Sequence, residues 1–483
     1  MTTSPQALAG QLLGILDKDA ERLSIIDRYS RGDHDDPYIP DLADDEYRLL
    51  ARRSVSNWLP LLIGTPAQAL YVDSYRPSRK PAETNAEPSE PSASWKHWQY
   101  SRLDARQAAV YRGALTFGHS FTVTERDAKG KVTTKGLSAL RTAALYEDAA
   151  NDDDAYAALT VTKKPHGEKG RGQARLWDAK RVYKLTYLSL TDPTTIRVDA
   201  GKLHGNAECP VTRFAAAVDL DGRTSGVVEP MIPLQDRINQ TIFDLLVAQT
   251  YGSFKVRWAT GMAPPIIRDE EGEAVLDVDG QPQPLPINLN AKRFLFGEDD
   301  TVNFGTLDET PLGGYIESID MSIRHLGAIS QTPPHYLLGQ IANLSAEALT
   351  AAETALARKV EEFKHVFGEA WERVFRLAAQ LDGNTADAED FEGEVYWRDM
   401  EGRSLAQTAD GLGKLAESLG IPKRGLWRRV PQITQGEIDE WGDMLEQDRP
   451  EVAMSGALRR AGAANQPAPV APVVAAPEQP PAA

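Results

Sequence analysis

Residue types capable of catalysis are present in the chain, but their spacing completes no known catalytic motif. Residues 411–414 (GLGK) lack the Gly-x-x-x-x-Gly-Lys-Ser/Thr spacing that cradles phosphates. Residues 222–226 miss the Gly-x-Ser-x-Gly spacing of a hydrolase nucleophile. The eight histidines are scattered, and His325 and His335 have two prolines between them. We therefore expect no enzyme activity, no cofactor and no resident metal ion.

The acidic runs and the cysteine of the chain are interpreted as structural rather than catalytic. The acidic runs at 152–154 and 299–300 resemble metal ligands only loosely, and Asp219 and Asp221 lack the other spaced ligands of a calcium loop. All are interpreted as solvated carboxylates. The one cysteine, Cys209, excludes a disulfide within the chain. We interpret Cys209 as a small buried apolar residue. The lack of a disulfide fits a reducing, cytoplasmic setting.

The charge balance limits the kind of partner that the chain can hold. Acidic residues outnumber basic ones by 70 to 53, which gives a formal net charge of -17. Stable binding of nucleic acid needs a basic surface, so only passing contact with DNA fits this composition. Two basic clusters are interpreted as solvated faces or subunit contacts, with phosphate contact as the alternative. They are Lys163, Lys164, Lys169, Arg171 and Arg175, and Lys423, Arg424, Arg428 and Arg429 around Trp427.

Length and hydropathy predict several domains and no membrane segment. The 483 residues correspond to about three domains. No apolar run approaches the roughly 18 residues of a membrane span. We also expect no signal peptide at the start of the chain.

Helical and strand-like patterns alternate in the first half and predict an α+β domain. Residues 5–30 and 44–62 have helical periodicity, and the second helix is expected to end at the Gly64-Thr65-Pro66 turn. Residues 117–214 contain short alternating strands, including a hairpin around 127–130.

The second half predicts two helices around a small β-rich insertion. Residues 228–251 carry an apolar stripe, with Asp236, Asn239, Gln240 and Asp244 expected on other faces of the helix. Residues 252–310 contain short strand-like runs separated by Gly and Pro. A second apolar stripe follows and consists of Ile316, Ile319, Ile323 and Leu326.

A proline break and a very long helix come next. Pro333 and Pro334 forbid a continuous helix through this point. Residues 345–381 then keep one apolar stripe, which predicts a helix of roughly 55 Å. Helical patterns return over 403–448, and the Ala- and Pro-rich end of the chain is expected to be disordered.

This order of elements resembles the portal proteins of tailed double-stranded DNA bacteriophages, especially those of long-tailed phages that infect actinobacteria. The likeness covers roughly residues 1–450. The stretches that carry it are NWLP (57–60), LDARQ (103–107), EPMIPLQDRINQT (229–241), FGTL (304–307), QTPPHYLLG (331–339) and NLSAEAL (343–349).

The resemblance implies an α+β portal fold whose parts follow one another along the chain. These parts are a wing (1–227), a stem helix (228–251), a β-rich clip (252–310), a second stem helix (311–331), a tunnel loop (332–344), a long helix with its return to the wing (345–402), a crown or the helices next to it (403–450) and a disordered tail (451–483).

The resemblance also implies a function and a set of partners. Such proteins form a dodecameric ring at one capsid vertex, through which double-stranded DNA is packaged and ejected. The expected partners are further copies of the chain, the terminase large subunit, a head-completion adaptor, and the major capsid and scaffolding proteins. The expected location is the virion, after assembly in the host cytoplasm.

Candidate DNA-facing residues follow from the same resemblance. An acidic channel wall lets DNA slide, because like charges prevent lasting contacts. The stem candidates are Asp236, Asp244, Glu317 and Asp320. The tunnel-loop candidates are Pro333, Pro334, His335, Tyr336, Leu337, Leu338, Gly339, Gln340 and Asn343. Tyr336, Leu337 and Leu338 are expected to present apolar bulk to DNA, or else to pack into a corner between helices.

Other classes of protein remain as alternatives. A capsid-associated adaptor without a DNA channel shares the same composition. A nuclease or hydrolase needs converging carboxylates, which the sequence does not show. A packaging ATPase needs the absent phosphate loop.

Overall fold

The computed structural model divides the chain into two compact units that are interleaved in sequence. Unit 1 comprises Met1–Asp27, Leu61–Glu229 and Thr350–Ala483, and unit 2 comprises Arg28–Pro60 and Pro230–Leu349. The structure describes residues 4–39, 45–78, 93–152, 154–166, 170–252, 257–260, 266–269, 271–276, 280–283, 303–306, 311–339, 346–399, 405–431 and 433–447. Both helices and sheets occur, so the predicted α+β class is confirmed.

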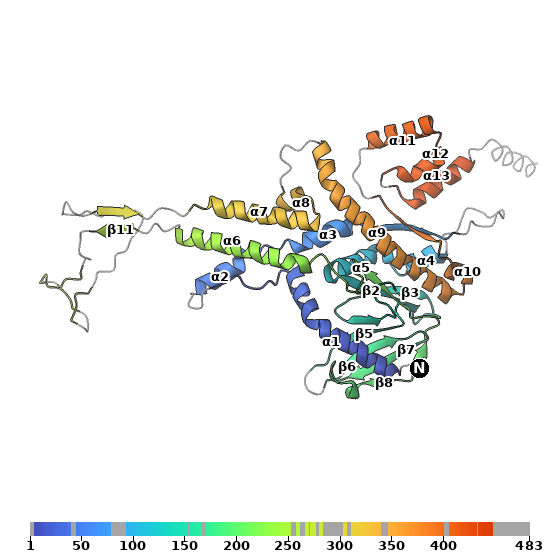
Figure 1. The fold of residues 1–483 in the computed structure, drawn as a ribbon, viewed down its shortest axis with the longest axis horizontal. Coiled ribbons are helices and arrows are strands. Elements are labelled where there is room, and N and C mark those ends of the chain that lie inside the picture. Colours follow the sequence, from blue (N-terminus) through green and yellow to red (C-terminus); the bar gives the residue numbers. More distant parts are fainter. Residues whose placement is uncertain are drawn as a thin grey trace, which may run out of the picture. The chain divides into compact units, whose positions relative to one another are not determined.

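Unit 1 contains a six-stranded antiparallel sheet covered by a long N-terminal helix (Figure 1). The strands run in the order β4-β5-β6-β7-β8, with β9 also paired to β7. Their bounds are β4 Thr142–Leu145, β5 Ala157–Lys163, β6 Gly172–Trp177, β7 Arg181–Tyr187, β8 Arg197–Val198 and β9 Lys202–Leu203. Helix α1 (Pro5–Ser30) buries Leu8, Leu12 and Leu13 against this sheet, so the apolar stripe predicted over 5–30 is the core-facing side of the helix.

Two smaller sheets complete the strand content of unit 1. One has the order β10-β2-β3, with β2 His119–Arg126, β3 Val132–Leu137 and β10 Val211–Ala215. The other pairs β1 Val72–Arg76 with β13 Glu394–Trp397. The predicted hairpin is confirmed, because the Asp127 carboxylate accepts backbone N–H bonds from Lys129 and Lys131 in the turn between β2 and β3.

The long helix α9 (Ala346–Asp382) is a single element of 37 residues, as the sequence predicts. In unit 1 its C-terminal half supplies Phe367, Trp371 and Phe375 to an aromatic cluster with Trp98 and Tyr111. Burial of such large rings is among the strongest contributions to a core. The helix therefore owes its length partly to a core that it shares with α4 (Ala93–Tyr100) and α5 (Leu103–Phe117).

Short helices follow α9 in the remainder of unit 1. They are α10 Thr385–Ala388, α11 Leu405–Leu419, α12 Lys423–Leu426 and α13 Gln435–Gln447, with the 3₁₀ turn η3 Trp427–Arg429 directly after α12. Two other 3₁₀ turns lie before α9 in the chain, η1 Pro193–Thr195 and η2 Glu229–Met231. Residues 451–483, predicted to be disordered, lie outside the described residues.

Unit 2 is built around two long helices, α6 (Ile232–Gly252) and α7 (Gly313–Ser330), which pack together. Helix α2 (Asp45–Ser54) packs on α6 by burying Leu50 and Ala51 against Phe243. In the stretch of chain that connects α6 to α7, strands β11 (Arg257–Thr260) and β12 (Asn303–Thr306) pair with each other in antiparallel orientation. This pair supports the predicted β-rich character of 252–310, most of which lies outside the described residues.

One predicted helix boundary is wrong. Residues 44–62 do not form one helix, because α2 ends at Ser54 and a second helix, α3, runs from Leu59 to Ala69. The Asn57 side chain accepts the backbone N–H of Leu59 at 3.2 Å, and Pro60 occupies the first turn, where its missing N–H costs nothing. The expected turn at Gly64-Thr65-Pro66 lies inside α3.

Candidate functional site

Helices α6 and α7 form an antiparallel pair in unit 2. Arg237, near the start of α6, donates a hydrogen bond to Nδ1 of His325, near the end of α7, at 3.3 Å. On α7 the buried face includes Ser322, Ile323 and Leu326, while Ile316 is 52% exposed although the sequence pattern placed it in the stripe.

Two buried amides hold the N-terminal half of α6 to residues 54–58 of the same unit. Gln235 accepts the backbone N–H of Trp58 at 3.0 Å and donates to the carbonyl of Ser56 at 2.7 Å. It also donates to Oδ1 of Asn239 at 3.0 Å, and that oxygen accepts the backbone N–H of Ser56. Both amides are almost fully buried. Asn239 was expected on a face away from the apolar stripe, and the structure shows that this face is buried as well at position 239.

His34 extends this network to the end of α1. Its Nδ1 accepts a hydrogen bond from Nδ2 of Asn239 at 2.8 Å, and its Nε2 donates to the carbonyl of Tyr29 at 3.0 Å. The imidazole stacks on the Tyr29 ring with centroids 4.7 Å apart. Sequence reasoning missed His34 and Gln235 as positioning residues. The available signal was the four-residue spacing of Gln235 and Asn239, which places both amides on one side of α6.

The Tyr29 hydroxyl lies between two carboxylates. It is 2.8 Å from Oδ1 of Asp236 and 3.1 Å from Oδ2 of Asp35. Burial raises the pKa of Asp236, with the Tyr29 hydrogen bond opposing that change. Arg28 hydrogen-bonds Asp35 at 2.9 Å and lowers the pKa of that carboxyl.

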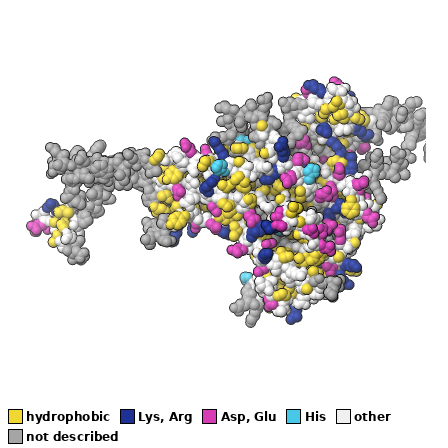
Figure 2. All heavy atoms as spheres, viewed as in Figure 1, with side chains coloured by type: hydrophobic (Ala, Val, Ile, Leu, Met, Phe, Trp, Pro, Cys, Tyr) yellow, Lys and Arg dark blue, Asp and Glu magenta, His cyan; other side chains and the backbone are white. Residues whose placement is uncertain are grey.

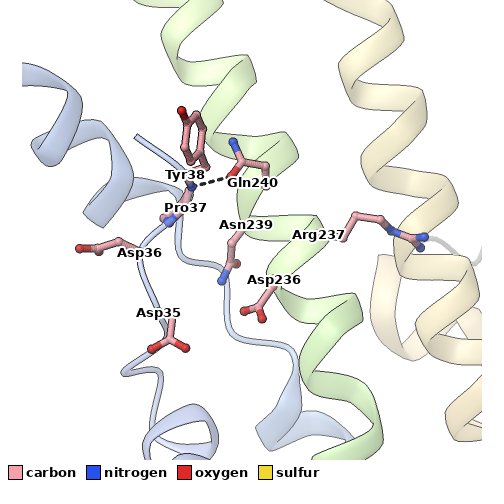
Figure 3. Close-up of a pocket in the computed structure, with 8 residues that line it drawn as sticks. All are labelled: Asp35, Asp36, Pro37, Tyr38, Asp236, Arg237, Asn239 and Gln240. Carbon is pink, nitrogen blue, oxygen red and sulfur yellow. Dashed lines mark hydrogen bonds between the residues drawn. The ribbon is translucent and has the colours of Figure 1, made fainter. Parts of the chain in front are cut away.

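A hollow of about 340 Å³ lies beside these carboxylates (Figure 3). It is lined by Asp35, Asp36, Pro37, Tyr38, Asp236, Arg237, Asn239 and Gln240. In Figure 3 the segment with Asp35 to Tyr38 lies on one side of α6 and Arg237 extends from the other side. The backbone N–H of Tyr38 donates to Oε1 of Gln240 at 2.7 Å, which fixes this segment on the helix.

The four acidic stem candidates differ in their surroundings. Asp236 binds Tyr29, and Asp244 accepts a hydrogen bond from Gln240 at 3.0 Å. Glu317 is exposed and Asp320 is half-buried on α7, where their spacing places them on one face together with the exposed Arg324. That face of α7 carries two carboxylates and one guanidinium in each copy.

The proline segment after α7 contains a short helix, α8 (Pro334–Leu338), where an irregular loop was expected. Pro333 is the N-cap and Pro334 takes the first helical position, so the two prolines start a helix here. Gln331 and Gly339 have positive φ and end α7 and α8 respectively.

The tunnel-loop candidates divide into buried, exposed and undescribed residues. Pro333 and Leu337 are buried, and Leu337 is only 3% exposed. Its burial fits the alternative of a corner packed between helices, and contact of Leu337 with DNA stays a prediction. Tyr336 is 44% exposed and its ring lies 4.5 Å from that of His335. Pro334 and Gly339 are exposed and Leu338 is half-buried, while Gln340 and Asn343 lie outside the described residues.

Comparison with known proteins decides the family. The sequence profile described as "Phage portal protein, SPP1 Gp6-like" matches residues 10–451, which is most of the chain. The chain belongs to this phage portal protein family. It is 32% identical over 165 residues to the portal protein of Mycobacterium phage D29, covering 34% of this chain and 33% of the relative. It is 29% identical over 182 residues to the portal protein of Mycobacterium phage L5, covering 37% of each chain.

The aligned stretches therefore span about a third of each mycobacteriophage portal protein. The family match extends far beyond them, and portal proteins of this family are structural components of the bacteriophage virion rather than enzymes.

The described part of this portal protein shows no metal-binding cluster. Within the described ranges, no three His, Cys, Asp or Glu side chains are placed to hold a metal ion. Cys209 is buried, and burial raises the pKa of its thiol to about 12, which keeps the thiol unreactive. Among the same residues, no helix has the length and apolar character to cross a membrane.

Proposed function

We propose that the chain assembles as a dodecameric ring at one capsid vertex and that DNA passes through the centre of this ring during packaging and ejection. The family assignment supports the general role. The observation that carries the channel is the antiparallel α6/α7 pair, which ends at a tight proline bend and carries an exposed charged face on α7.

In this proposal α6 and α7 are the stem helices, and Glu317 and Asp320 contribute negative charge to the channel wall. Repulsion from phosphates shortens DNA contacts, and the neighbouring Arg324 leaves the face net negative. Asp236 and Asp244 are secondary candidates, because each already accepts a hydrogen bond inside the chain.

The other parts follow the order that the resemblance implies. Residues 1–227 would form the wing, which faces the major capsid and scaffolding proteins, and 252–310 the clip, which meets the terminase large subunit and then the head-completion adaptor. Residues 332–344 would line the narrowest part of the channel, with Tyr336 as an exposed aromatic group of its described part. Residues 345–402 would return to the wing, and 403–450 would form the crown. Assembly in the host cytoplasm and incorporation into the virion complete the proposal.

A charge reversal tests the channel assignment. Glu317→Lys with Asp320→Lys makes the α7 face basic. Rings should assemble as in the wild type, but the amount of packaged DNA should fall about tenfold or more, because the lysines would bind the phosphates of DNA as it moves through the channel. Asp17→Lys with Glu21→Lys, two exposed positions on α1, makes the same change elsewhere and should leave packaging unchanged. Wild-type packaging by the α7 variant would refute the channel role.

A further inference from the structure

Two of the C-terminal helices expose apolar faces in the isolated chain. On α11, none of the side chains that the structure describes is buried, and Leu419 is 68% exposed. On α13, Trp441, Met444 and Leu445 are 37%, 51% and 48% exposed. Amphipathic helices are normally stabilised by covering such faces, so this segment has apolar surface available for another contact.

Opposite charges are separated on the same segment. Lys423 and Arg429 are exposed at α12 and η3, and neither forms an ion pair or side-chain hydrogen bond with any described residue. Glu440 and Asp443 are exposed on α13 and equally have no such partner in the described part of the chain. Figure 2 shows hydrophobic and basic side chains close together over this C-terminal part.

Two other carboxylates of α13 already have partners. Glu437 accepts hydrogen bonds from the backbone and hydroxyl of Thr434, both at 2.8 Å, and Asp439 accepts one from Gln435 at 2.7 Å. Among the α13 carboxylates whose side chains the structure describes, Glu440 and Asp443 therefore differ from Glu437 and Asp439 in having no hydrogen-bond or ion-pair partner.

Contacts of neighbouring residues hold the segment that carries these basic and acidic groups. The backbone N–H of Gln435 donates to Asp73 at 2.6 Å, and the Arg428 guanidinium lies 4.3 Å from the centre of the Tyr396 ring. Trp427 meets Trp441 edge to face at 5.9 Å. The segment is held in place within the chain, yet its basic residues (Lys423, Arg429) do not pair with its acidic residues (Glu440, Asp443). These four side chains are therefore available to pair with another molecule.

Building on the proposed ring, we infer that α13 of one copy docks on the basic corner formed by Lys423 and Arg429 of the next copy. The two faces differ, so the contact is heterologous and can repeat around a closed ring. Apolar side chains of α13 and α11 would be covered in the same contact. DNA is the less suitable occupant, because Glu440 and Asp443 on the same segment repel phosphates.

Two complementary variants test this contact. Lys423→Glu with Arg429→Glu makes the corner acidic, and Glu440→Lys with Asp443→Lys makes α13 basic. Each variant alone places like charges at every contact, and we expect the fraction of protein in rings to fall about tenfold in low salt, measured by native mass spectrometry. An equimolar mixture should restore rings in which the two variants alternate, because every contact again joins opposite charges.

A matched control and the contrary outcomes complete the test. Lys180→Glu with Lys184→Glu makes the same charge change on exposed residues of unit 1 outside both basic clusters and should assemble normally. Wild-type rings from either variant alone, or no rescue by mixing, would overturn this contact and leave the ring proposal standing. Rings that form normally but bind less DNA would likewise overturn it in favour of a phosphate contact. Failure of the wild type to form rings would instead refute the proposed function.

Discussion

Gly327 of α7 and Leu337 of α8 are in close contact across the proline break. A Cβ atom at position 327 would lie 2.9 Å from Cδ1 of Leu337 and 3.0 Å from the carbonyl oxygen of Thr332. The same turn is closed by a hydrogen bond from the backbone N–H of Thr332 to the carbonyl of Gly327 at 2.9 Å. Only glycine allows α8 to fold back this closely against α7.

Gly327→Ala should therefore displace α8 and lower the free energy of unfolding by about 1–3 kcal/mol, the usual cost of overpacking. Thermal unfolding followed by circular dichroism measures the change. Gly314→Ala on the same helix is the control, because nothing lies within 4 Å of its added methyl group. Equal melting temperatures for the two variants would show that the contact does not constrain the bend.

Asn239→Ala should destabilise unit 2 by about 1–3 kcal/mol, because it leaves the backbone N–H of Ser56 and Nδ1 of His34 without their side-chain partner. Urea unfolding measures this loss. Gln240→Ala removes two hydrogen bonds, to Tyr38 and Asp244, at a half-exposed position where water can replace them, and should cost less. A larger effect at Gln240 than at Asn239 would contradict the role of the buried amides.

Replacing Arg373 should strongly lower the stability of unit 1. Its buried guanidinium donates to the carbonyls of Val211 at 2.7 Å and Cys209 at 3.2 Å, and it pairs with Asp154. Arg373→Met should cost about 3–5 kcal/mol, since it orphans these groups. Arg376→Met, which removes a half-exposed cation from the face of the Phe391 ring, should cost much less. Similar unfolding curves for both variants would contradict this account.

Stability should fall as the pH drops from 7 to 5. Burial lowers the pKa of His97 and of His119 to about 4, whereas an unfolded histidine titrates near 6.5. Between these values the unfolded state binds more protons, so protonation favours unfolding and the stability present above about pH 6.5 is lost toward pH 4. His97→Gln should flatten the dependence of the melting temperature on pH. The same substitution at the exposed His166 should not, and an unchanged slope for His97→Gln would contradict the role of burial.

The sequence predicted those elements whose pattern is local. The stripe over 345–381 predicts α9 because one apolar face repeats through the whole helix. The hairpin between β2 and β3 is predicted by Asp127 and Gly130 in its turn. The break at Pro333 was predicted correctly, but the short helix that begins there was not. Two adjacent prolines indicate that a helix is interrupted, and they do not indicate whether a loop or a new helix follows.

Contacts between distant segments could not be read from the sequence. Gln235 and Asn239 look like solvent-facing residues of an amphipathic helix, and only the approach of residues 54–58 buries them. The same holds for Leu337, whose contact with Gly327 depends on how tightly α8 folds back. The channel-facing acids are a different case, because their role concerns neighbouring copies and remains a prediction.

Electron microscopy of the purified chain tests the central claim most directly. The account predicts rings of about twelve copies with a central hole wide enough for a DNA duplex, about 20 Å across, and with Glu317 and Asp320 at its wall. A population of monomers or closed, solid particles at micromolar concentration would contradict it.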